Sequence, residues 1–238
     1  MQKLLSKFTA AIETYNMIDE GDNIAVGVSG GKDSMVLLML LNELSKFYYK
    51  KFTVTAITLD MGFPQKCDYS PILNFCNSNN IKYHIKNTNL YNIIFNTRKE
   101  KNPCSLCSKM RRGILHNMTV SLNCNKIALG HHLNDAAETF MMNLTQNGRI
   151  KCFSPVSYLS RKNIHMIRPM IFINESEIIN FINKTNLYVL KSQCPADKTG
   201  SRNKTKELIS KLEVDYNGLS DHIINALQKE NINGWGKR

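Results

Sequence analysis

The chain has 238 residues, of which 42% are hydrophobic, so it can hold one α/β domain with a sizeable core, and nothing in its composition demands a second large domain. Its formal net charge of +12 favours a polyanionic partner, most simply nucleic acid, and its seven cysteines, an odd number without a secretory signal, argue against a disulfide framework. No apolar stretch approaches the roughly 20 residues of a membrane helix, so we expect no membrane association and a cytoplasmic location.

Strands and helices are predicted to alternate along the chain. Residues 1–16 are expected to form an amphipathic helix and residues 17–22 a turn. Strands are predicted at 24–28, 52–59, 82–85 and 126–129, and helices at 35–41, 69–79, 108–123 and 134–143. A short strand at 164–169 and helices at 174–186 and 205–212 follow. This order predicts a doubly wound, mostly parallel sheet, which binds its ligands at the carboxyl ends of the strands.

The turn after the first strand has the sequence SGGKDS. Its glycines let the backbone approach a ligand closely, the following helix contributes partial positive charge, and the lysine adds a full charge. The adjacent glycines, and the aspartate between lysine and serine, distinguish it from the Walker pattern. The turn is therefore predicted to bind a phosphate or pyrophosphate group through Ser29, Gly30, Gly31, Lys32, Asp33 and Ser34.

A second strand-to-helix turn carries two imidazoles and a carboxylate. It consists of Gly130, His131 and His132, with Asp135 three residues further on. A lone histidine there is most often a hydrogen-bonding group at a helix start. Here two histidines occur together with Asp135, on the same sheet edge as SGGKDS. This combination predicts contacts to ATP phosphates, to Mg²⁺ or to the activated substrate.

A C-x-x-C motif, Cys104 and Cys107, lies at the start of a helix, where thiol pKa values are lowered. Zinc, an iron–sulfur cluster and a redox disulfide remain open, because the chain has no second C-x-x-C. Cys194, in a basic segment, is the best candidate for a third ligand. Three cysteines would leave one iron of a four-iron cluster without a protein ligand, where an exogenous sulfide could bind. The other cysteines, Cys67, Cys76, Cys124 and Cys152, are interpreted mainly as core or loop residues.

Basic side chains concentrate in two places beside the cysteines. One surrounds residues 109–112 and the other spans residues 191–211. A merely basic, soluble surface would also explain the charge. We predict that the clusters contact nucleic-acid phosphates through Lys109, Arg111, Arg112, Arg202 and Lys206.

The chain resembles the tRNA 2-thiocytidine synthetase family, a branch of the PP-loop ATP pyrophosphatases, in four strings that follow the family's order and spacing. They are AIETYNMIDEGDNIAVGVSGGKDS, CSLCSKMRRGIL, KIALGHHLNDAAETFMMNL and IRPM, and the resemblance runs from about Phe8 to Cys194. The family often has a second C-x-x-C where this chain has Cys194 followed by Pro195, Ala196 and Asp197. That departure leaves open which tRNA position is modified.

The resemblance implies an ATP-dependent tRNA thiolase with a PP-loop domain, Mg²⁺ and a [4Fe-4S] cluster on Cys104, Cys107 and Cys194. Lys32, Asp33 and these cysteines would be the catalytic residues. ATP would adenylate the C2 carbonyl oxygen of a pyrimidine, and sulfur would then replace that oxygen. The implied partners are tRNA and a sulfur donor, such as a cysteine desulfurase or inorganic sulfide, with a homodimer as the candidate assembly.

The same interpretation divides the chain into three parts. Residues 1–22 would form an N-terminal helix, residues 23–190 the PP-loop ATPase domain, and residues 191–238 a basic segment that carries the third cysteine. Asp60 and Met61, at the end of the second strand, would approach the adenosine.

Two other functions explain part of the pattern. A PP-loop ligase that attaches an amine to an adenylated tRNA base, as in lysidine synthesis, would use SGGKDS and the histidine turn but needs no cysteine triad. A non-catalytic, zinc-stabilised tRNA-binding protein would use the loop only to hold a nucleotide. Cluster colour, metal content and pyrophosphate release distinguish the three.

Overall fold

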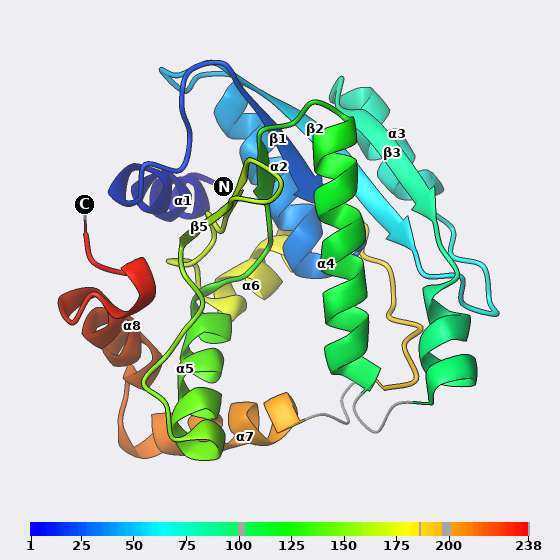
Figure 1. Ribbon diagram of the computed structural model, residues 1–238. Helices are drawn as coiled ribbons and strands as arrows, with labels where there is room; N and C mark the ends of the chain where they lie inside the picture. The colour runs from blue at the N-terminus through cyan, green and yellow to red at the C-terminus, as the bar shows by residue number, and fades with distance from the viewer. Residues whose placement is uncertain (100–102, 186, 197–200, 238) are drawn as a thin grey trace.

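The computed structural model describes residues 1–99, 103–185, 187–196 and 201–237, and its strands form one six-stranded sheet with helices on both faces (Figure 1). The strand order is β3-β2-β1-β4-β6-β5. All neighbouring pairs are parallel except β5 with β6. The strands are β1 (Asp22–Gly27), β2 (Phe52–Asp60), β3 (Lys82–Asn87), β4 (Lys126–Ala128), β5 (Val156–Leu159) and β6 (Ile164–Ile167).

Successive residues of β1 face opposite sides of the sheet, as strand geometry requires. Ile24 and Val26 join the larger apolar cluster, whereas Ala25 joins a smaller one packed on Leu115 and Met118. The larger cluster includes α1 (Gln2–Thr14), α2 (Lys32–Ser45), α3 (Ser70–Ser78), α5 (Leu133–Asn147) and α6 (Glu175–Thr185). The helix α4 (Pro103–Ser121) covers the other face, in front of the strands in Figure 1. The predicted doubly wound, mostly parallel fold is confirmed.

The two ends of the chain pack into the same core. The helices α7 (Ser201–Asp215) and α8 (Leu219–Lys229) contact α5, and the 3₁₀ turn η2 (Ile232–Gly234) follows α8. Trp235 is fully buried, and the Tyr15 hydroxyl donates a hydrogen bond to its carbonyl at 2.9 Å. In the part of the chain that the structure describes, no helix combines the length and the apolar character needed to cross a membrane.

Several elements differ from the sequence prediction. The structure adds the edge strand β5, the helix α8 and a π-helical segment, η1 (Asn92–Arg98). It also begins α4 at Pro103, not at residue 108, so that Cys104 lies in its first turn and Cys107 at the start of its second. Among the residues in the predicted elements and strings, Asn186 and Asp197 lie outside the described residues.

The strand order reverses beside β1. The chain moves outward from β1 to β2 and β3, then crosses back to place β4 on the other side of β1. In such sheets the turns after the two central strands diverge and leave a crevice at their carboxyl ends. The SGGKDS loop follows β1 and the histidine turn follows β4, so both lie where a ligand is expected.

Candidate active site

The SGGKDS loop is held in shape by its own serines. Ser34 donates its hydroxyl hydrogen bond to the Gly31 carbonyl at 2.9 Å and accepts one from the Ser29 amide at 3.2 Å. The Ser29 hydroxyl accepts from the Gly31 amide at 3.3 Å. No side chain caps the start of α2 in the structure as described, so the amides of its first turn and its dipole face the edge of the sheet. This arrangement suits a phosphate group.

Lys32 lies among carboxylates at the mouth of the loop. Its ammonium is 2.7 Å from Asp33 Oδ1 and 3.1 Å from Glu175 Oε1. Burial opposes its charge, but these partners outweigh that effect and raise the pKa of Lys32. Burial likewise opposes ionisation of Glu175, yet Lys206 and Lys32 lower its pKa to about 2. Both groups are therefore charged at neutral pH.

The histidine turn packs directly on the SGGKDS loop. A Cβ atom at Gly130 would lie 3.1 Å from the backbone of Asp33, so glycine permits this approach. His132 Nε2 is 3.9 Å from Asp33 Oδ1 and 3.6 Å from Asp135 Oδ2. His132 and Asp135 also form a reciprocal capping box at the start of α5. Two turns from distant parts of the chain thus share one cluster of polar groups.

His131 points into a different environment from His132. Its ring lies 5.1 Å from that of Phe153. Burial lowers the pKa of His131 to about 3, and the nearby charge of Arg168 acts in the same direction. The imidazole of His131 is consequently neutral at physiological pH.

A cavity lies where the SGGKDS loop meets the histidine turn, lined by Lys32, Asp33 and His132. Helix α7 adds two cations to its lining, Arg202 and Lys206. Arg202 forms ion pairs with Asp135 and Glu138, the latter at 2.7 Å, and Lys206 lies 2.6 Å from Glu175. Burial opposes the charge of Arg202. The carboxylates of Asp135 and Glu138 outweigh burial, so the pKa of Arg202 is raised.

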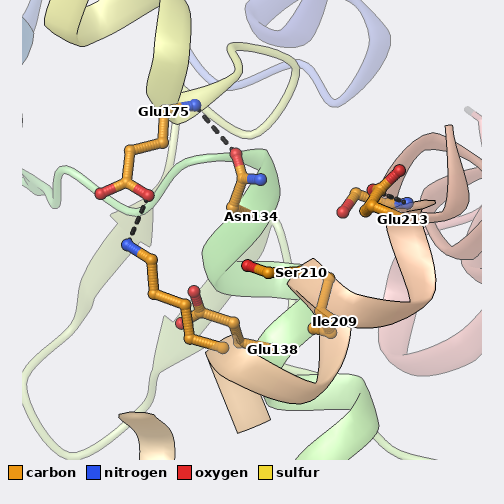
Figure 2. A pocket seen from close by; sticks show the side chains of 8 residues that line it. Asn134, Glu138, Glu175, Ile209, Ser210 and Glu213 are labelled. Carbon is orange, nitrogen blue, oxygen red and sulfur yellow. Dashed lines mark hydrogen bonds and ion pairs between the residues drawn. The ribbon is translucent and has the colours of Figure 1, made fainter. Parts of the chain in front are cut away.

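A second hollow lies beside this cavity, between α5, α6 and α7. Figure 2 shows Glu175 facing Asn134, whose side-chain oxygen accepts a hydrogen bond from the Glu175 amide at 2.8 Å. Glu138, Ile209 and Ser210 also line this hollow. The asparagine fixes the start of α6 and thereby orients the carboxylate that joins Lys32 and Lys206.

Asp60 and Met61 lie at the carboxyl end of β2, next to the SGGKDS loop in the strand order. The Asp60 carboxylate accepts a hydrogen bond from the Gly62 amide at 2.9 Å, and the Met61 carbonyl accepts one from the Tyr91 amide at 2.8 Å. Gly62 has a φ of +71°, and a Cβ there would lie 2.6 Å from the Thr88 carbonyl oxygen. The turn is therefore fixed against the end of β3.

The predicted cysteine triad comes from two segments. Cys104 is exposed in the first turn of α4, and Cys107 and Cys194 are half-buried, all as free thiols. Burial raises the pKa of Cys107, Arg111 lowers it, and the nearby charges of Cys194 and Cys104 raise it further. Cys104 and Cys194 are therefore both near enough to Cys107 for their charges to act on its thiol.

The described residues contain no group of three or more His, Cys, Asp and Glu side chains already arranged to hold a metal ion. The donor set nonetheless fits an iron–sulfur cluster in kind, because the free thiols of Cys104 and Cys107 share the start of α4 and Cys194, from a separate segment, is near enough for its charge to act on Cys107. Cys104 is exposed, so an incoming cluster could reach it.

The segment that carries Cys194 also contacts the SGGKDS loop. The Leu190 amide donates a hydrogen bond to the Gly30 carbonyl at 2.9 Å. Gly30 has a φ of +82°, and a Cβ there would lie 2.9 Å from Leu190 Cγ. In Figure 1 this segment runs beside α4. One short stretch of chain thus connects the loop with the third cysteine.

Comparison with known proteins agrees with this geometry. The family model of the PP-loop domain matches residues 2–212. A tRNA-cytidine(32) 2-sulfurtransferase from Pelobacter propionicus is 37% identical over 221 residues, which cover 91% of this chain and 81% of the relative. A tRNA-cytidine(32) 2-sulfurtransferase 2 from Francisella tularensis is 37% identical over 233 residues, covering 95% and 85%. The chain belongs to the PP-loop family, among the tRNA-cytidine(32) 2-sulfurtransferases.

Solved structures agree with this assignment. The U34-tRNA thiolase NcsA from Methanococcus maripaludis, solved with its [4Fe-4S] cluster, has a TM-score of 0.77 and 25% identity to this chain, and the match covers 94% of this chain and 78% of NcsA. An NH3-dependent NAD synthetase from Campylobacter jejuni has a TM-score of 0.52 at 16% identity, which shows the fold alone.

The structure of this PP-loop protein separates the predicted tRNA-binding residues into two groups. Lys109, Arg111 and Arg112 are exposed on α4, near the cysteines. Arg202 and Lys206 form the ion pairs with carboxylates described above. Their charges are thus partly neutralised within the protein, which the count of basic residues does not reveal.

Cys76, Cys124 and Cys152 are buried, and burial raises the pKa of Cys76 to about 11 and that of Cys152 to about 12. Cys76 and Cys124 are core residues, as predicted. Cys152, expected in a loop, lies outside the helices and strands but is buried in the core, and Cys67 is half-buried.

Sequence reasoning missed Glu138, Glu175 and Leu190. Glu138 had a usable signal, because it lies three residues after Asp135 and so shares its face of the helix. Glu175 and Leu190 act through contacts with segments far away in the chain, for which the sequence gives no local signal.

Proposed function

We propose that this protein is an ATP-dependent, iron–sulfur-dependent tRNA thiolase that replaces the C2 oxygen of a tRNA cytidine with sulfur. The observation that carries the proposal is the placement of the thiols. Cys194 follows a segment hydrogen-bonded to Gly30 of the SGGKDS loop, and its charge acts on Cys107. This arrangement supports a nucleotide-activating loop next to a sulfur-handling site. The names of the relatives support cytidine 32 of tRNA as the substrate position.

ATP binds, in this proposal, along the carboxyl edge of β1, β2 and β4. The SGGKDS loop and Lys32 hold the phosphates that leave as pyrophosphate, and Asp60 and Met61 lie beside the adenosine. Asp33 and Asp135, which flank His132, are the carboxylates available to Mg²⁺ next to those phosphates.

The reaction has two steps that balance. The C2 carbonyl oxygen of the base attacks the α-phosphorus of ATP, and the bond to pyrophosphate breaks. A sulfur nucleophile then adds to C2, and the carbon–oxygen bond breaks to release AMP. Lys32 offsets negative charge that develops on the leaving pyrophosphate. Adenylation makes the oxygen a good leaving group, which the free carbonyl is not.

Cys104, Cys107 and Cys194 would hold a [4Fe-4S] cluster as thiolates. Such a cluster, when bound by three cysteines, leaves one iron without a protein ligand, where sulfide can be held. Burial disfavours the thiolate of Cys107, and Arg111 offsets part of that effect. The first turn of α4 favours negative charge on the same side.

The exposed row of Lys109, Arg111 and Arg112 is proposed to contact tRNA phosphates beside the cysteines, and Arg202 and Lys206 to do so at the mouth of the cavity. The sulfur donor would be a cysteine desulfurase or inorganic sulfide. A cytoplasmic location and a homodimer complete the proposal.

The test is to react the anaerobically purified protein with unmodified tRNA, ATP, Mg²⁺ and sulfide, and then to analyse the tRNA nucleosides by mass spectrometry. We expect a nucleoside in which one oxygen of cytidine is replaced by sulfur. Cys194→Ala should lose both cluster iron and this product while still binding ATP, and Cys124→Ala is the matched control that retains all three. An adduct bearing an amine would indicate a lysidine-type ligase. Zinc without pyrophosphate release would indicate a binding protein.

A further inference from the structure

Arg168 is a buried arginine with no acidic partner among the residues that the structure describes. It follows β6 directly and only 7% of its surface is exposed. Its Nη1 donates to the Ser154 carbonyl and its Nη2 to Met166 Sδ, but its Nε is buried without a hydrogen-bond partner. Among the ion pairs of the described residues, none involves Arg168. Burial of a charge without a partner is unfavourable, so such a group needs an explanation beyond packing.

The groups around Arg168 leave its charge uncompensated overall, although Cys152 partly favours it. Burial lowers the pKa of Arg168 to about 10, and the charge of Arg112 on α4 acts in the same direction. The guanidinium carbon lies 4.9 Å from the centre of the Phe153 ring, and His131 contacts the same ring. His131 Nδ1 is also buried without a partner. His131 is faced by Arg168, Arg202, His132 and Arg112, so cations predominate around it.

Two unsatisfied polar atoms, Arg168 Nε and His131 Nδ1, thus belong to residues that contact the same Phe153 ring beside the carboxyl ends of β4 and β6, and the charge of Arg112 acts on both residues. A guanidinium and an imidazole that each have an unpaired nitrogen are suited to an anion with several acceptor oxygens. The site lies toward the β6 side of the sheet, whereas the SGGKDS loop follows β1 and Asp60 follows β2. It is therefore displaced from the groups that hold ATP.

We infer that Arg168, His131 and Arg112 form a binding subsite for a phosphate group of the substrate tRNA. The inference rests on the proposed function. Arg112 lies five residues after Cys107 on α4, about 7.5 Å along the helix axis. A nucleotide whose phosphate occupies this subsite would have its base near the cysteines. Arg112 is exposed and carries the positive charge of the site to the surface of α4.

The protein contains a natural reporter of this subsite. Trp235 is its single tryptophan, and its ring lies 6.2 Å from that of Phe153, which contacts both His131 and Arg168. Tryptophan fluorescence of the anaerobically purified protein can therefore be titrated with CMP, cytidine and inorganic phosphate. We expect CMP to bind about tenfold or more tightly than cytidine, and phosphate to compete with CMP, because charge-assisted hydrogen bonds to the phosphate are strong.

Variants identify the residues responsible. Arg168→Gln should reduce the affinity for CMP to that for cytidine, and Arg168→Lys should retain part of the difference. Arg149→Gln, which removes an exposed arginine elsewhere, should change neither affinity. Because Arg168→Gln removes a buried hydrogen-bonding group, its fold is checked by circular dichroism. If it does not fold, Arg112→Gln on the exposed surface replaces it and should weaken CMP binding several-fold.

Three results would overturn the inference. The unaltered protein could bind CMP and cytidine equally, or the preference for CMP could persist in the Arg168 and Arg112 variants. The third result is that these variants lose affinity for a non-hydrolysable ATP analogue in parallel with CMP. The last result would assign the subsite to the phosphates of ATP. None of these measurements depends on sulfur transfer. A protein that prefers CMP through Arg168 but forms no thiolated nucleoside would contradict the proposed function and leave the subsite standing.

Discussion

Replacement of Gly30 by alanine tests whether the SGGKDS loop and the third cysteine are mechanically connected. Gly30 has a φ of +82°, a conformation that costs a residue with a Cβ about 1–2 kcal/mol. The new methyl group would lie 2.9 Å from Leu190 Cγ and closer still to Cδ1, so Leu190 must move away. Loss of its partly buried packing costs about 1–2 kcal/mol more. The total is about 2–4 kcal/mol.

The consequence extends beyond stability. If Leu190 leaves the loop, the hydrogen bond from its amide to the Gly30 carbonyl is lost as well, and the segment that carries Cys194 is released. We expect Gly30→Ala to lower the melting temperature by roughly 4–16 °C, since 1 kcal/mol corresponds to about 2–4 °C in a chain of this size. We also expect it to lower the iron content after cluster reconstitution.

Gly31→Ala is the matched control. Gly31 has a φ of −71°, and a Cβ there would meet only Ser29 Oγ, at an ordinary 3.4 Å. Thermal unfolding and iron analysis should therefore separate the two variants. Leu190→Ala combined with Gly30→Ala should recover the stability lost to the clash with Leu190. It should not recover the stability lost to the positive φ at residue 30. Equal melting temperatures and equal iron contents for the two glycine variants would refute the reasoning.

Three further predictions concern charge. Lys32→Ala should abolish pyrophosphate release while the circular dichroism spectrum is retained, and undiminished release would remove Lys32 from the ATP site. Arg111→Gln should flatten the dependence of log affinity for tRNA on log salt by about one unit, whereas Lys206→Gln should flatten it less, because Glu175 already pairs with Lys206. The pKa of Glu175, lowered to about 2 from 4.5, means that its ion pairs stabilise the fold above pH 4.5 and that this contribution is lost as the pH falls toward 2. In urea titrations, the stability lost by Glu175→Gln should therefore be large at pH 6 and shrink toward pH 2, and a constant difference would contradict the assigned ion pairs.

The sequence by itself determined the features that depend on neighbouring residues. The apolar run before SGGKDS and the apolar helix after it specify a strand-to-helix turn, because glycine and serine supply the conformations and hydrogen bonds that the turn needs. In the same way, the C-x-x-C motif places Cys104 and Cys107 in one helical turn. The alternation of strands and helices was enough to predict the doubly wound sheet and the edge at which its ligands bind.

The tertiary structure alone decided which distant groups meet. The path of the segment after α6 brings Leu190 onto Gly30 and Cys194 near enough to Cys107 for its charge to act there, and no local pattern encodes either pair. The short edge strand β5 was missed because its stability comes from pairing with β6. Arg202 illustrates the physical reason most clearly. A sequence records the charge of a side chain, but whether that charge faces solvent, a ligand or a carboxylate is set by the packing of elements that are far apart in the chain.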